Sequence, residues 1–167
     1  MRWFHEPGGR NISVMQSHDI SEEIVEDLYA EALVLADDVR AVFDLRLGAE
    51  STGSDDLLRV ALSIEGLRTT TRVMHVLAWL LNQRAFYSGE LSETQLRRHG
   101  ALPQERTSDP DNIAMLEPET QALIRESEEL HARVARLDRA WRKRNDDKDA
   151  PVQALQGRIA KAFAVGG

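Results

Sequence analysis

The sequence predicts an all-α protein: a bundle of three long helices, an irregular connection with a short helix before the third one, and a flexible C-terminal tail. Three segments repeat apolar residues every three or four positions, which is the period of an amphipathic helix. No segment shows the alternation of apolar and polar residues that is typical of a strand. With 167 residues and 42% hydrophobic side chains, the chain has enough apolar material for a single core.

The first helix is expected over residues 21–47, where Ser21 is placed to cap its start and Gly48 to end it. The segment carries eight acidic and two basic side chains, a net charge of -6 out of -7 for the whole chain. Such an acidic face is either simply solvated or steers a basic partner, with Glu31, Asp37 and Asp38 as the candidate contacts. The apolar stripe consists of Ile24, Leu28, Ala32, Leu35, Val39 and Val42.

The second helix is expected over residues 57–87 and is apolar on more than one face. Its main stripe consists of Leu57, Val60, Ile64, Leu67, Thr71, Met74, Ala78 and Leu81. At about 100° per residue, Val73, Val76, Leu77 and Leu80 point well away from that stripe. A helix that is apolar all round must be covered all round. We therefore expect a second subunit, or the segment that follows, to bury this second set; the alternative is that loops of the same chain cover it.

Four polar and aromatic residues share a stripe beside the main one: Arg68, Arg72, His75 and Trp79. In one interpretation they form a docking patch for an acidic or phosphorylated partner, anchored by Trp79. In the other, the two arginines pair with acids of the first helix inside the bundle, Trp79 fills the core and His75 is a hydrogen-bonded buried side chain. With Val76 and Leu80, these residues are the candidates for the interior or for a subunit interface.

The connection is expected over residues 88–117, and its length is typical of a functional or covering segment. Ser92 and Gln95 have the spacing of a capping box for a short helix that ends near Arg98. The third long helix is expected to start at Pro118 and to end at about Arg144. Its apolar stripe keeps heptad spacing around the polar Ser127 and consists of Leu123, Leu130, Val134, Leu137 and Trp141.

The tail follows a charged linker, residues 145–151, and carries a marginal amphipathic helix. Leu155, Ile159 and Phe163 on that helix are candidates for docking on the bundle or on a partner. The domain boundaries predicted in this way are a disordered N-terminal tail over residues 1–20, the helical bundle over residues 21–145 and a flexible tail over residues 146–167.

Several function classes find no support in the sequence. The chain has no cysteine, no glycine-rich phosphate loop and no His-Glu-x-x-His pair, so we expect no catalytic residue, no metal and no cofactor. The absence of a signal peptide and of a long apolar run predicts a cytoplasmic protein with no membrane contact. A metal-dependent helical enzyme and a DNA-associated regulator that uses Arg142, Lys143 and Arg144 are the alternatives, although the net charge argues against nucleic acid as the main partner.

Two segments resemble a known family. These are Leu-Tyr-Ala-Glu-Ala-Leu-Val-Leu-Ala-Asp-Asp at residues 28–38 and Glu-Gly-Leu-Arg-Thr-Thr-Thr-Arg-Val-Met-His-Val-Leu-Ala-Trp-Leu-Leu-Asn-Gln-Arg-Ala at residues 65–85. Over residues 21–144 the chain resembles the RcdA (regulator of CtrA degradation) family of alphaproteobacteria. The resemblance implies a homodimeric three-helix bundle without catalytic activity. It also implies an adaptor that works with CpdR, a response-regulator-like protein, to deliver cell-cycle clients such as CtrA-type regulators to the ClpXP protease.

Overall fold

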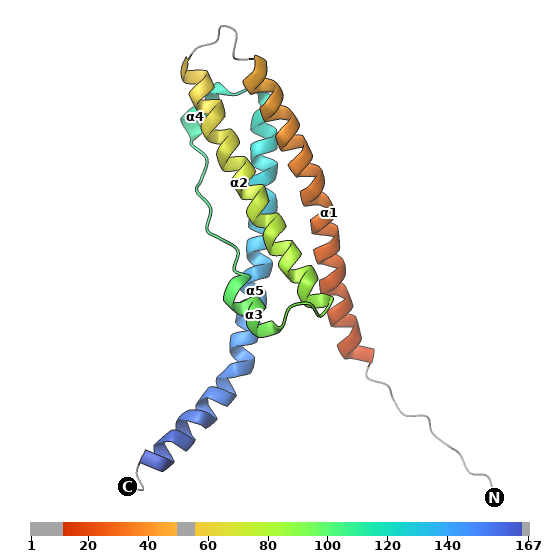
Figure 1. The fold of residues 1–167 in the computed structure, drawn as a ribbon, viewed down its shortest axis with the longest axis vertical. Coiled ribbons are helices and arrows are strands. Elements are labelled where there is room, and N and C mark those ends of the chain that lie inside the picture. Colours follow the sequence, from red (N-terminus) through yellow and green to blue (C-terminus); the bar gives the residue numbers. More distant parts are fainter. Residues whose placement is uncertain (1–11, 50–55, 165–167) are drawn as a thin grey trace, which may run out of the picture.

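The computed structural model describes the backbone of residues 12–49 and 56–164, and side chains mainly between residues 22–44 and 56–144. Three long helices, α1 (Ile12–Ala49), α2 (Asp56–Tyr87) and α5 (Pro118–Ala164), form the body of the molecule (Figure 1). Two short helices, α3 (Glu93–His99) and α4 (Pro110–Met115), lie in the connection between α2 and α5. The described residues contain no strand, which confirms the all-α prediction.

The direction of the helices explains the long connection. Helix α2 runs antiparallel to α1, while α5 runs parallel to α2, so the chain must return along the bundle before α5 begins (Figure 1). Arg84 of α2 joins the antiparallel pair. Its Nε donates to Oε1 of Glu26 on α1 at 2.6 Å, and its guanidinium lies 4.4 Å from the centre of the Tyr29 ring. The parallel pair is joined by Trp79, whose indole nitrogen donates to Asp138 at 2.9 Å.

The core lies between the facing sides of α1, α2 and α5. On α1 four residues of the predicted stripe are buried, whereas Val25 and Phe43 take the places expected for Ile24 and Val42. On α5 the predicted stripe is confirmed, since Leu123, Leu130, Val134 and Trp141 are buried and Leu137 packs against the cluster. Ser127 is buried on this stripe as well.

The two faces of α2 are reversed relative to the prediction. The predicted main stripe is solvent-exposed along its whole length. The second apolar set, which was expected to need a partner, forms the core instead. Val73, Val76 and Leu80 are buried between α1 and α5, and Leu77 packs against them. Counting apolar residues favoured the wrong face because the buried one also holds polar or small residues, namely Glu65, Gly66, Thr69, Arg72 and Gln83.

Gly66 shows why a small residue belongs on the inner face of α2. A Cβ atom at this position would lie 2.7 Å from Cδ1 of Phe43 on α1. The hydrogen of glycine therefore lets the Phe43 ring pack directly against the α2 backbone, and the two helices approach closely at this level.

Two helix boundaries differ from the prediction. Helix α1 begins at Ile12, nine residues before Ser21, because residues 12–20 contain neither Gly nor Pro to stop it. Helix α5 continues to Ala164 through the segment predicted as a linker. The single helix breaker in that segment is Pro151, and a proline inside a helix can kink it without ending it.

The connection contains the predicted short helix and one that was missed. The capping box of α3 is confirmed: the Ser92 side chain accepts from Gln95 N, and the Gln95 side chain accepts from Ser92 N at 2.9 Å. Helix α4 starts at an Asp-Pro pair, with Asp109 as the N-cap that accepts from the Asp111 backbone at 3.0 Å. A proline in the first turn after a capping aspartate is a helix start signal that could have been used.

Candidate functional site

A buried arginine joins α2, the connection and α5. Arg72 is 1% exposed, and its Nη1 donates to Ser127 Oγ at 2.7 Å while its Nη2 donates to Ser108 Oγ at 3.1 Å. Its charge is paired with Glu105 of the connection and with Glu128 of α5, the latter at 3.4 Å. Burial lowers the pKa of Arg72 below its usual value, and the charge of Glu128 opposes this most. These contacts satisfy a cation that would be costly to bury alone.

A buried carboxylate next to it fixes the far end of the connection. Glu65 is fully buried, and its Oε1 accepts from Arg68 at 2.5 Å, from Asn112 at 3.1 Å and from the backbone of Asp109 at 3.2 Å. Its Oε2 has no hydrogen-bond partner within the described structure. One α2 side chain thus holds both the N-cap and the first turn of α4.

His131 of α5 closes the network from the other side. Its Nδ1 lies 3.2 Å from Oε2 of Glu105, and its Nε2 lies 3.4 Å from the carbonyl oxygen of Pro103. Burial lowers the pKa of His131 from its usual 6.5, and the positive charge of Arg72 acts in the same direction, although the contact with Pro103 opposes it. The connection is therefore fixed to the bundle at residues 103, 105, 108 and 109.

The four polar and aromatic residues predicted to share a stripe on α2 lie in two different environments. Arg72 and Trp79 lie in the interior, whereas Arg68 and His75 lie at its edge, beside a groove. The arginines pair with acids, but these acids come from α2, the connection and α5, so the prediction that α1 supplies them is wrong. Glu65 could have been suspected, since it precedes Arg68 by one helical turn; Glu105 and Ser108 carry no such signal.

Val76 and Leu80 are not available to a second subunit. Both are 0% exposed within a single chain, so the expectation that another copy buries them is wrong. The argument for an exposed apolar face survives on the opposite side of α2.

We call that side the outer α2 face. It is made of the eight residues that repeat every three or four positions from the start of the helix: Leu57, Val60, Ile64, Leu67, Thr71, Met74, Ala78 and Leu81. Leu67 is 71% exposed and Met74 57%. The row runs from residue 57 to residue 81, about 36 Å at 1.5 Å per residue.

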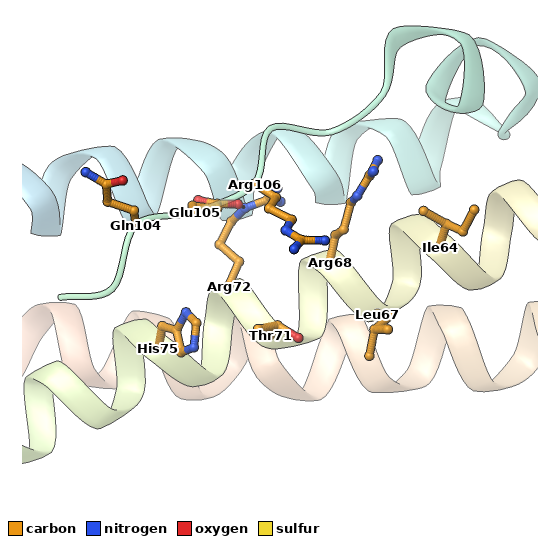
Figure 2. Close-up of a pocket in the computed structure, with 9 residues that line it drawn as sticks. All are labelled: Ile64, Leu67, Arg68, Thr71, Arg72, His75, Gln104, Glu105 and Arg106. Carbon is orange, nitrogen blue, oxygen red and sulfur yellow. Dashed lines mark ion pairs between the residues drawn. The ribbon is translucent and has the colours of Figure 1, made fainter.

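A groove of about 420 Å³ runs between this face and the connection (Figure 2). Ile64, Leu67 and Thr71 of the outer α2 face form its apolar side. Charged and polar residues line the rest: Arg68, Arg72, His75, Gln104, Glu105 and Arg106. Figure 2 shows the Arg106 side chain directed from the connection toward α2. The groove is within the size range of ligand sites.

The remaining candidates do not join this site. Glu31 is exposed and pairs with Arg133 of α5, while Asp37 and Asp38 are exposed on α1. Leu155 is exposed on the distal part of α5. The side chains of Ile159 and Phe163 lie outside the described residues.

The described residues offer no metal cluster, since nowhere do three or more of their His, Asp or Glu side chains gather to hold an ion. None of the described helices combines the length and the apolar composition that a bilayer crossing requires.

Comparison with known proteins gave one match. The model of a family described as "Protein of unknown function (DUF1465)" matches residues 16–163. Neither the curated proteins nor the solved structures contain a match to the chain.

Proposed function

Because this chain belongs to the DUF1465 family, whose function is unknown, we propose from its own sequence and geometry that it is a non-enzymatic adaptor that acts by binding other proteins. The observation that carries the proposal is the outer α2 face. Its side chains form a continuous exposed row in which Thr71 is the one polar member, although the same helix uses its other side for the core.

The size of the face supports a binding role. Six exposed aliphatic side chains of this kind present on the order of 500 Å², which is near the upper end for the largest patch on a monomer. Single exposed leucines are common and need no explanation. A row about 36 Å long on one helix is different, because its shape matches a second helix laid along it.

The resemblance of residues 65–85 to the RcdA family supports a more specific form of the proposal. In this form the chain is a cytoplasmic homodimer that works with CpdR-type proteins and delivers CtrA-type clients to the ClpXP protease. The three-helix bundle with its exposed face is compatible with such a role, which needs binding surfaces and no reactive group.

The decisive experiment has two parts. Purified ClpX, CpdR-type protein and client are first tested for capture by the tagged chain, and the rate of client degradation by ClpXP is then measured with and without it. We expect capture and faster degradation. Failure to capture any of the three, by a chain with a normal circular dichroism spectrum, would reject the proposal.

Two matched variants link the result to the outer α2 face. Met74→Asp places a charge on this face, whereas Val34→Asp places one at an equally exposed site of α1 (57% and 63% exposed). We expect only Met74→Asp to reduce capture or the dimer fraction measured by light scattering. A gel shift at low salt tests the DNA-binding alternative, which predicts a shift that disappears as salt is added.

A further inference from the structure

We infer that the groove between α2 and the connection binds an acidic, aliphatic segment of a protein partner, with an aliphatic side chain on Ile64 and Leu67 and a carboxylate facing Arg68 and Arg106. This inference rests on the proposed function and names the class of partner that the site recognises.

The apolar side of the groove favours an aliphatic group. Ile64 and Leu67 line it and remain partly in water, so a ligand that covers them gains the free energy of burying apolar surface. Both residues belong to the outer α2 face, which extends on either side of the groove. A small molecule would fill the groove alone, whereas a polypeptide can occupy the groove and follow the exposed row beyond it.

The charged side of the groove favours an anion. Three arginines and one glutamate line it, so its formal charge is +2 with His75 neutral. Glu105 is already paired with Arg72 and lies beside His131, and Glu65 pairs with Arg68 through one guanidinium nitrogen. Among the arginines of the lining, Arg106 is therefore the one for which the described residues show no ion pair. The whole chain is acidic, with a net charge of -7, whereas the residues that line this groove are formally positive. Complementary charge therefore selects an acidic partner segment.

The wall that carries Arg106 is already in place before any ligand arrives. Glu105 and Ser108 on either side of it are bound to Arg72, and the backbone of Asp109 is bound to Glu65. A ligand therefore does not have to order this part of the connection, and less of its binding free energy is lost to entropy.

The test uses three fluorescein-labelled helical peptides of 18 residues and the purified full-length chain. The first repeats leucine at helical spacing with glutamates beside it; the second replaces each leucine with serine; the third replaces each glutamate with lysine. Fluorescence polarisation measures the dissociation constant of each. We expect the first peptide to bind about tenfold more tightly than either of the others, and to weaken as salt is raised.

Two substitutions locate the binding site. Arg106→Glu reverses an exposed charge of the groove, and Leu67→Ser removes its most exposed apolar side chain. Each is expected to weaken binding of the first peptide about five- to tenfold. The matched controls, Arg139→Glu on α5 and Val34→Ser on α1, are exposed and lie outside the groove, so they should leave binding unchanged.

The outcomes separate this inference from the proposed function. Equal binding of the three peptides, no binding of the first peptide, or no effect of Arg106→Glu and Leu67→Ser would overturn the inference. Client delivery that persists in both variants would leave the adaptor function standing without the groove. Peptide binding with no capture of ClpX, CpdR-type protein or client would leave the groove standing without that function.

Discussion

The same substitution on opposite sides of α2, Leu80→Ala and Leu67→Ala, tests which face of this helix belongs to the core. Leu80 is 0% exposed, whereas Leu67 is 71% exposed. Both positions lie within one helix and undergo one chemical change, so the change in helix propensity is the same and cancels in the comparison. The difference between the two variants therefore measures burial alone.

The expected magnitudes follow from that burial. Leu80→Ala removes three carbon atoms from an enclosed site, and at about 0.8 kcal/mol per methylene-sized group the transfer term is about 2.4 kcal/mol. The cavity left behind adds to it, for an expected loss of about 3 to 4 kcal/mol in the free energy of unfolding. Leu67→Ala removes the same atoms from a hydrated site, and its expected loss is about 0.5 kcal/mol or less.

Urea unfolding followed by circular dichroism measures both losses. With a slope of about 2 kcal/mol per molar urea, the midpoint should fall by about 1.5 to 2 M for Leu80→Ala and by about 0.3 M or less for Leu67→Ala. Measurements at several protein concentrations separate folding from association, because a partner copy on the outer α2 face would stabilise only the concentrated samples. Equal losses in dilute samples, or a larger loss for Leu67→Ala, would refute the assignment of the faces.

Three further predictions concern the interior. Gly66→Ala should lower the free energy of unfolding by about 1 kcal/mol, because overpacking against Phe43 outweighs the gain in helix propensity. In a double-mutant cycle measured by thermal unfolding, the added substitution Phe43→Leu should restore part of this loss. Arg72→Met should lower the free energy of unfolding by about 3 to 5 kcal/mol and speed proteolysis of residues 101–109, because two carboxylates lose their cation. Arg72→Lys should lower this free energy less. Equal proteolysis rates for the Arg72→Met variant and the unsubstituted chain would contradict the anchoring role. The His131 pKa is lowered in the folded state, so the folded state binds the imidazole proton more weakly than the unfolded state does. The free energy of unfolding should therefore fall as the pH drops below about 6.5. In urea titrations at several pH values, His131→Gln should remove this part of the pH dependence.

The sequence was sufficient for the fold class and for the core-facing sides of α1 and α5. Helical period predicted three long helices, and capping chemistry predicted α3 and the start of α5 at Pro118. These features depend on neighbouring residues alone, which is why local patterns reveal them. The end of α5 could not be predicted in this way, because a proline such as Pro151 ends some helices and only kinks others.

The faces of α2 depend on contacts that sequence neighbours do not show. The inner face holds Glu65 and Arg72, whose burial depends on partners from other parts of the chain. Ser108, Glu105 and Ser127 bind Arg72, whereas Asn112 and the backbone of Asp109 bind Glu65. A rule that places charged residues on the exposed side of a helix therefore assigns the wrong face of α2 to the core. The groove was also beyond prediction, since its two sides come from segments about 30 to 40 residues apart.

The length of α5 has a consequence for how the molecule responds to heat. The last described core residue of this helix is Trp141, and the helix continues to Ala164 beyond the bundle (Figure 1). This extension needs no nucleation, because the bundle holds the turns before it, and its described side chains beyond Arg144, namely Leu155, Gln156 and Lys161, are exposed. Its helical content should therefore decrease gradually from the C-terminal end as temperature rises, before the cooperative melting of the bundle. A sloping ellipticity baseline that disappears when residues 146–167 are deleted would be the signature of this zipper-like fraying.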